Sequence, residues 1–201
     1  TTDAHLGGHP HSVCAIQVTE AIESLADGAL RGEALLTLGQ VELEAGRPES
    51  AAAILARAVQ TLEAADSDDL AGVAYSRSAV ALARAGRFDD ADDAVSSALA
   101  LAARLGSGRL RHRSLAAMGA VAEARGSMKS AAARYGEAAE VAMQEGAEAS
   151  AARAHVLAAV TRLEIDDFAS AAVHADAAQR LGRRHGMLSV TQLATAIQGA
   201  L

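Results

Sequence analysis

The sequence predicts an all-α fold, an α-solenoid built from antiparallel helix hairpins. First, 53 of the 201 residues are Ala and only two are Pro, which are the best and the worst helix formers. Second, aromatic residues make up only 2% of the chain, so the core has little large apolar surface and needs close approach between helix backbones. Third, the sequence repeats itself with a fixed period, from position 39 to positions 79, 119 and 159, as stacked helical hairpins do. A β-sandwich or β-barrel is excluded on these grounds.

Four segments align without gaps at this period. They span about 32–71, 72–111, 112–151 and 152–186. A column of small residues holds Gly39, Ala79, Gly119 and Ala159, and seven positions later stand Gly46, Gly86, Gly126 and Asp166. Two positions further are Pro48, Phe88, Met128 and Phe168, followed by two columns of Ala (Ala51, Ala91, Ala131 and Ala171; Ala58, Ala98, Ala138 and Ala178). Each repeat is predicted to form two helices joined by a turn.

Each column has a physical reason within such a hairpin. Gly39 falls in the middle of the first helix, where Gly costs about 1 kcal/mol relative to Ala, so we expect it to admit a closely packed partner helix. Gly46 follows that helix and suits a left-handed C-terminal cap, a conformation that Asp166 adopts less readily. Pro48 lies in the first turn of the second helix, where its missing N–H costs nothing. The two Ala columns are expected to be buried against the partner helix.

Two further helices flank the four repeats. The first is an apolar stripe with helical spacing in 12–26, at Ala15, Val18, Ile22 and Leu25. The second is a terminal helix over 188–201, which is expected to pack Val190, Leu193 and Ile197 against the fourth repeat. We therefore expect a flexible segment over 1–11 and a single repeat domain over 12–201, with terminal helices that cap the array.

This arrangement resembles the tetratricopeptide (TPR) repeat family, in a variant with a long period of forty. The family places Leu-Gly, Gly, Ala, a bulky residue and Ala at fixed offsets, and the first repeat matches at Leu38-Gly39, Gly46, Ala51, Leu55 and Ala58. The usual early Trp is replaced in the four repeats by Leu35, Tyr75, Leu115 and His155. The resemblance implies four TPR-like repeats plus flanking helices in a right-handed superhelix, whose first helices line a concave groove.

The resemblance also implies which residues face a partner in that groove. Carried across the alignment, the groove positions include Gln40, Arg77, Arg84, Arg113, Glu123 and Arg153. Arg77, Arg113 and Arg153 come from three successive first helices and would form a basic ladder. Because Arg presents a planar fork suited to carboxylates, the expected partner is a protein or an acidic peptide. In the alternative, nearby glutamates pair with these arginines and leave a solvated face of mixed charge; they are Glu44, Glu123 and Glu164.

Charge and composition limit the other partners. The formal net charge is −7 and the pI is near 5.5, which argues against direct nucleic-acid contact by this segment. The single cysteine, Cys14, cannot form an internal disulfide and is expected to be a buried thiol, so nothing requires an oxidising compartment. No apolar stretch approaches the ~18 residues of a membrane span. We expect a cytoplasmic protein without membrane contact.

Sequence motifs for chemistry are weak. The segment 126–130 has Lys and Ser after a Gly but lacks the glycines of a phosphate-binding loop. His5, His9 and His11 cluster without a scaffold that could fix metal ligands. His155 and His174 are expected not to face each other. The four aromatic residues, Tyr75, Phe88, Tyr135 and Phe168, are expected to fill the core. We therefore expect no enzyme activity, no cofactor and no metal site.

The sequence leaves two functions open. The first is a non-enzymatic, TPR-like scaffold that binds a protein or peptide, as the regulatory segment of a larger bacterial transcriptional regulator; the use of Arg over Lys and the abundant Ala indicate a GC-rich bacterial genome. The second is a solenoid that senses a small-molecule inducer on its inner face. Self-association through an apolar terminal edge is a further expectation.

Overall fold

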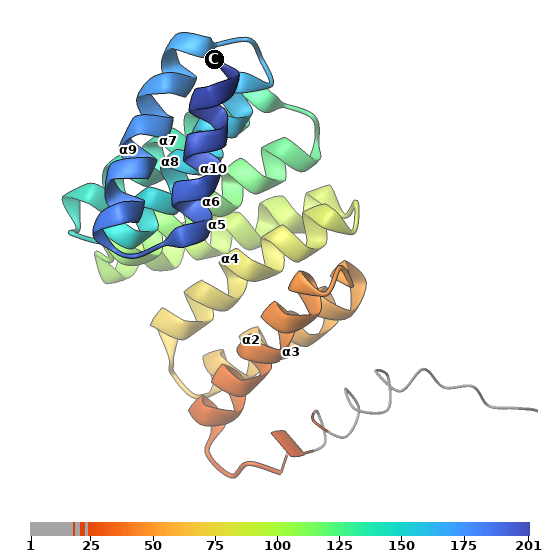
Figure 1. The fold of residues 1–201 in the computed structure, drawn as a ribbon. Coiled ribbons are helices and arrows are strands. Elements are labelled where there is room, and N and C mark those ends of the chain that lie inside the picture. Colours follow the sequence, from red (N-terminus) through yellow and green to blue (C-terminus); the bar gives the residue numbers. More distant parts are fainter. Residues whose placement is uncertain (1–17, 19–20, 23) are drawn as a thin grey trace, which may run out of the picture.

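The computed structural model describes residue 18, residues 21 and 22, and residues 24–201. Within these residues the regular structure is entirely helical and contains no strand. The helices are α2 (Gly28–Glu44), α3 (Pro48–Ala64), α4 (Asp68–Arg84), α5 (Phe88–Leu105), α6 (Gly108–Ala124), α7 (Met128–Gln144), α8 (Glu148–Leu163), α9 (Phe168–Arg184) and α10 (Leu188–Ala200). The predicted all-α solenoid is confirmed (Figure 1).

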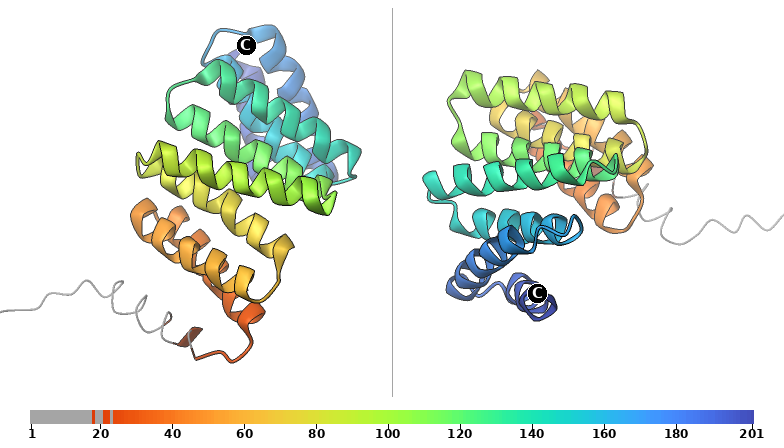
Figure 2. Two further views of the ribbon diagram at one scale, coloured as in Figure 1. Left: turned by 180° about the vertical axis from the view of Figure 1, so that it is seen from behind. Right: turned by 90° about the horizontal axis from the view of Figure 1, so that it is seen from above.

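Helices stack in the order of the sequence. Each helix packs against the next one along the chain, and the short turns between them make successive helices antiparallel. Figure 2 shows the array from behind and from above, where it curves so that α9 and α10 lie far from α2 and α3. Stacking of this kind buries a continuous core between neighbouring hairpins.

A residue in the left-handed conformation follows each of the helices α2 to α9. Gly46 has φ +74°, as the sequence predicted, and Asp166 adopts the same conformation, with φ +59°, although Asp favours it less than Gly does. Arg47 N–H donates to Glu42 O at 3.0 Å across the first of these turns, which satisfies a carbonyl at the helix end. The full set is evenly spaced along the chain, at Gly46, Asp66, Gly86, Gly106, Gly126, Gly146, Asp166 and Gly186. The unit of the chain is therefore one helix plus one turn, a half-repeat that the alignment of whole hairpins did not separate.

The small and Ala columns pack as predicted. A Cβ added at Gly39 would lie 2.5 Å from Leu55 Cγ, and one added at Gly119 would lie 2.6 Å from Tyr135 Cε1. These distances are too short for a Cβ atom at either position. The two glycines therefore let the partner helix of the same hairpin pack closely. The Ala columns are at most 1% exposed, at Ala51, Ala58, Ala91, Ala98, Ala131, Ala138, Ala171 and Ala178.

The prediction that all four aromatic residues fill the core is wrong. Tyr135 is 2% exposed, but Phe168 is 50% exposed because it stands at the first position of α9, beside the turn. Phe88 and Tyr75 are half-buried. The Arg125 guanidinium lies over the Phe88 ring at 5.2 Å from its centroid, a cation–π contact at the surface.

The terminal helix packs partly as predicted. Val190 and Ile197 are buried against the preceding hairpin, where α10 contacts α8 and α9. Leu193 is 44% exposed and Ala194 is buried instead. Positions 190, 194 and 197 share one helical face, and Leu193 lies one step around the helix from it.

The expectation that His155 and His174 do not face each other is also wrong. Their Nδ1 atoms lie 2.9 Å apart and their ring centroids 5.2 Å apart. Each residue lies near the middle of its helix, and the middles of α8 and α9 oppose each other in an antiparallel hairpin. Burial, with a smaller contribution from His174, lowers the pKa of His155 to about 4, so the pair is neutral near pH 7 and shares one N–H···N hydrogen bond.

Candidate binding groove

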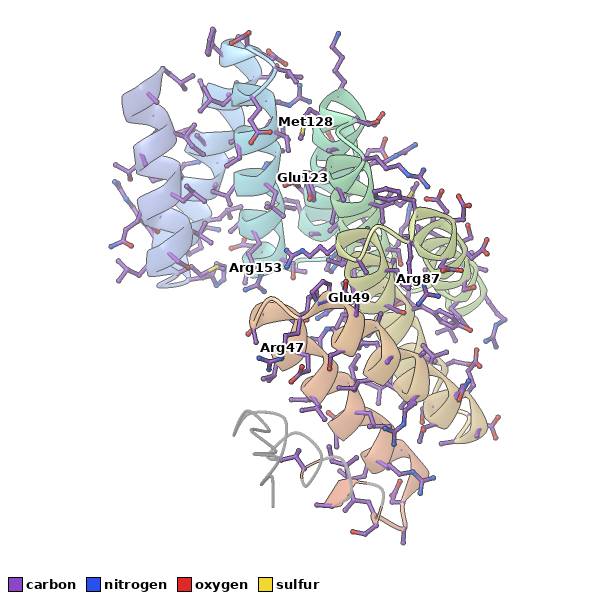
Figure 3. The ribbon with its side chains drawn as sticks, turned by 90° about the vertical axis from the view of Figure 1, so that its right-hand side faces the viewer. Arg47, Glu49, Arg87, Glu123, Met128 and Arg153 are labelled. Atoms are coloured by element: carbon purple, nitrogen blue, oxygen red, sulfur yellow. The ribbon has the colours of Figure 1, made fainter. Side chains whose placement is uncertain are left out.

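A groove of about 720 Å³ runs along the inner side of the solenoid. Helices α2, α4, α6 and α8 form its walls, and α7 contributes to its floor. Figure 3 labels three lining residues, Glu123, Met128 and Arg153, which come from α6, α7 and α8 and face the same hollow. All six groove residues expected from the sequence line it: Gln40, Arg77, Arg84, Arg113, Glu123 and Arg153.

The inner helices are in contact at α4 and α6 but separated at α6 and α8. Between α4 and α6, the Leu110 side chain occupies the space that Gly72 leaves free, and Leu110 is 1% exposed. Ser76 Oγ and Ser114 Oγ lie 3.3 Å apart in the same interface. Helices α6 and α8 hardly touch, and α7 packs against both of them. The groove therefore opens between α6 and α8, over α7.

The α6–α8 interval differs from the α4–α6 interface at the two positions that pack together there. His112 and Ser150 take the positions of Gly72 and Leu110 one period later. The close packing of a Leu side chain on a Gly that joins α4 to α6 therefore has no counterpart between α6 and α8. His112 and Ser150 both line the groove.

Small apolar residues line the part of the groove between α6 and α8. Ala116 and Ala154 take the positions of the Ser76–Ser114 pair one period later, and both line the groove. Tyr135 from α7 lies beneath them as part of the floor. The two serines that meet between α4 and α6 are thus replaced by two alanines between α6 and α8, where the helices stand apart.

Positive charge exceeds negative charge in the groove. Four arginines line it, at Arg77, Arg84, Arg113 and Arg153, against two glutamates, at Glu44 and Glu123. Four minus two leaves an excess of two positive charges in a chain whose formal net charge is −7. A locally basic groove in an acidic protein concentrates anions and repels cations.

The groove carboxylates are engaged by neutral donors. Tyr135 Oη donates to Glu123 Oε2 at 2.7 Å, and Gln40 Nε2 donates to Glu44 Oε1 at 2.6 Å. Among the described residues, none of the four groove arginines forms an ion pair with a carboxylate. No ion pair among the described residues joins them to Glu44, Glu123 or Glu164, the carboxylates of the alternative that the sequence left open, although the charge of Glu44 acts on Arg77.

Two of the arginines have lowered pKa values, although the side chain of Arg113 is exposed overall. Desolvation first, and then repulsion from Arg109, Arg77 and Arg153, lowers the pKa of Arg113, and the charge of Asp69 partly offsets this. Desolvation also lowers the pKa of Arg77, which Glu44 partly offsets. Arg77 Nη1 donates to the backbone oxygen of Leu36 at 3.3 Å. An anion placed among these guanidinium groups would reverse the repulsion.

His112 is a groove residue that the sequence analysis missed. It is 5% exposed, and within the described part of the chain its Nε2 has no hydrogen-bond partner. Desolvation, followed by the charges of Arg113, Arg109 and Arg153, lowers the pKa of His112 to about 4. The ring is therefore neutral near pH 7. Its signal in the sequence was a His in a column that otherwise holds Gly32, Gly72 and Ala152.

Residues 18, 21–22 and 24–201 contain no group of three or more His, Cys, Asp or Glu side chains placed to hold a metal ion. His5, His9, His11 and Cys14 lie outside the described residues. In the same part of the chain, no helix combines the length and the apolar character needed to span a bilayer.

No protein-family model and no curated protein matches the sequence. Solved structures similar in fold include the following two. BtubC from P. vanneervenii is 20% identical, with a TM-score of 0.65 over 92% of this chain and 85% of that chain. The Signal Transduction ATPase with Numerous Domains (STAND) protein with a tetratricopeptide repeat sensor from Pyrococcus horikoshii is 15% identical, with a TM-score of 0.67 over 90% of this chain. The fold is that of a helical repeat protein. The chain spans only 28% of the length of the STAND protein.

Proposed function

We propose that the protein is a non-enzymatic, TPR-like scaffold whose groove binds an acidic peptide segment of a protein partner. The observation that carries this proposal is the excess of positive charge from four groove arginines, none of which forms an ion pair with a carboxylate among the described residues. Guanidinium groups form charge-assisted, bidentate hydrogen bonds with carboxylates. The partner's carboxylates would supply the counter-charge that the groove lacks.

The arrangement of the arginines favours an extended ligand. Arg77, Arg113 and Arg153 belong to α4, α6 and α8, so they follow one another along the groove. A peptide with several acidic residues can meet each of them in turn, whereas a single small anion can meet only one end. Helical repeat proteins present concave surfaces of this kind to their partners.

We further propose that this scaffold is the regulatory segment of a larger bacterial transcriptional regulator. Its support is the likeness in fold to a sensor-bearing STAND protein, of which the chain spans 28%. The test is the domain content of the full-length gene product. A DNA-binding or nucleotide-binding domain beside the repeats supports the proposal, and a gene product with neither overturns it.

A second candidate function is the sensing of a small-molecule inducer. The groove volume of about 720 Å³ favours it, because ligand pockets commonly measure ~300–1,000 Å³. This function requires the groove to bind a compact molecule as well as it binds a peptide. The two candidates are therefore separated by direct binding measurements.

Charge reversal at one groove arginine tests the peptide-binding proposal. The variant Arg113→Glu is compared with Arg111→Glu, an exposed arginine on the same helix that does not line the groove. Binding of capped, glutamate-rich peptides is measured by calorimetry. We expect Arg113→Glu to weaken binding by at least about tenfold, the equivalent of one charge-assisted hydrogen bond, and Arg111→Glu to leave it unchanged. Equal binding by both variants would contradict the proposal.

A further inference from the structure

The part of the groove between α6 and α8 forms a recess, which we call the α6–α8 recess. Its walls are Ala116 on α6 and Ala154 and Leu157 on α8, and its floor is Tyr135 and Ala138 on α7. Four of these five side chains are apolar, and the hydroxyl of the fifth, Tyr135, donates to Glu123, which also lines the groove. The recess therefore offers an apolar surface inside a groove whose other distinguishing feature is positive charge.

One wall of the recess is an uncovered apolar side chain. Leu157 is 38% exposed although it lines the groove, whereas Ala154, one turn earlier, is 5% exposed. Covering exposed apolar surface is favourable roughly in proportion to the area removed from water. An apolar group that enters the recess would cover Leu157 together with the Ala walls.

Arginines stand at the recess on both sides. Arg113 lies one turn before Ala116 on α6, and Arg153 lies one turn before Leu157 on α8, so each shares a helical face with the wall beside it. The charges of Arg113 and Arg153 act on each other and on His112. Anions are therefore favoured immediately beside the apolar surface, on either side of it.

The buried imidazole of His112 is a second sign that a ligand completes this region. It is 5% exposed, lines the groove, and leaves Nε2 without a hydrogen bond to any described residue. A buried polar atom without a partner costs free energy. A polar ligand group beside this ring would compensate a cost that the described part of the chain leaves in place.

We propose that the α6–α8 recess is the anchor site of the acidic peptide. It takes one aromatic or branched apolar side chain of the partner, flanked in the peptide by acidic residues that Arg113 and Arg153 bind. This inference rests on the proposed peptide-binding function and specifies its sequence preference. The acidic residues direct the peptide to the groove. The apolar side chain then fixes the register of the peptide along it.

The anchor is tested with two capped pentapeptides that differ in one side chain. Each has four glutamates, with Phe at the centre of one and Ala at the centre of the other, and binding is measured by calorimetry without a fluorescent label. Burying a Phe side chain is expected to strengthen binding by at least about tenfold. In Ala116→Leu, which fills the recess, this preference should fall to near unity. In the control Ala133→Leu, the same substitution on the exposed side of α7, it should persist.

A second variant covers the case in which Ala116→Leu does not fold. Leu157→Ala removes a part-exposed wall without overfilling the recess, and we expect it to reduce the preference for Phe several-fold while the melting temperature stays close to that of the wild type. Circular dichroism checks folding in each variant.

The outcomes separate the anchor from the acidic groove. Equal binding of both peptides to the wild-type protein, or a preference that survives both recess variants, overturns the anchor. If Arg113→Glu still weakens both peptides in that case, the proposed function stands without it. The last ligand tested is free phenylacetate, a phenyl ring that carries one carboxylate. If it binds as tightly as the Phe peptide, the recess is a small-molecule site and the peptide anchor is overturned.

Discussion

The α4–α6 and α6–α8 interfaces have the same place in the repeat but opposite character. In the first, Leu110 fills the space at Gly72, and the helices are in contact. In the second, His112 and Ser150 hold those two positions, and the helices stand apart over a floor made by α7. The closed interface and the open recess thus differ at two equivalent positions of the repeat. The fold tolerates the opening because α7 still packs against both α6 and α8.

The closed interface should be the more sensitive of the two to truncation. Leu110 is 1% exposed, so Leu110→Ala is expected to lower the free energy of unfolding by ~2–5 kcal/mol. Ser150→Ala, the matched change one repeat later, removes a half-buried hydroxyl and is expected to stay within about 0.5 kcal/mol of the wild type. Urea denaturation measures both. Similar losses would mean that the two interfaces are not different in packing.

The open interface should carry a pH dependence that the closed one lacks. The pKa of His112 is lowered to about 4 in the folded protein, against ~6.5 in an unfolded chain. Between these values the unfolded state binds a proton that the folded state does not, so the contribution of His112 is fully present above pH ~6.5 and is lost as the pH falls toward 4. The full loss is about 3 kcal/mol.

The measurement is a difference between two proteins, because carboxylates and His155 titrate in the same range. Urea denaturation of the wild type and of His112→Gln is compared from pH 7 to pH 4. The wild type should lose more stability than the variant on acidification. Parallel curves would show that His112 is not desolvated in the folded state, which would also remove it from the case for a ligand beside the recess.

The comparison of the two interfaces depends on the alignment of the repeats, and this alignment can be tested. Ala131 is 0% exposed in the α6–α7 hairpin, so Ala131→Leu is expected to overpack it and cost ~1–3 kcal/mol. Ala133→Leu, two positions along on the exposed side of α7, serves as the matched control and should have little effect. An unchanged melting temperature in Ala131→Leu would refute the column assignment.

The sequence predicted the hairpins well because their determinants are local and repeated. Gly39, Gly46 and Ala51 each report one backbone requirement, and the same requirement returns in the next repeat. The repeat of one helix and one turn was not predicted from the sequence. Asp66 occupies one of the left-handed turns, and the turns between hairpins were not aligned with the turns within them.

Pairs of residues from different helices were predicted less well. The six groove positions followed from a resemblance and all line one groove, but His112 and the floor residue Tyr135 were not among them. Finding His112 required asking which residues of different repeats line the same groove, because a single column of the alignment does not contain that information. The contact of His155 with His174 was missed for a related reason. The contact depends on the axial offset between two antiparallel helices, and an alignment of repeats does not contain that offset.

The smallest expected effect concerns the arginine beside the recess. Repulsion from Arg109, Arg77 and Arg153 outweighs the attraction of Asp69 for Arg113 in the folded protein, so Arg113→Gln should relieve the net repulsion and stabilise the fold slightly. Because Arg113 is exposed, solvent screening limits the gain to about 0.5 kcal/mol or less. The gain should vanish near 1 M salt, where the Debye length is ~3 Å, and Arg111→Gln, outside the groove, should show none.

The sign of that small effect matters more than its size. The same substitution is expected to weaken binding of the Phe-centred acidic peptide, because it removes a charge-assisted hydrogen bond. A residue that lowers stability while it raises affinity is there for the ligand, since packing alone would favour a neutral side chain. If Arg113→Gln instead destabilises the fold at low salt, the arginine is held by favourable contacts within the protein, and the groove's positive charge is a feature of the fold and not of a binding site.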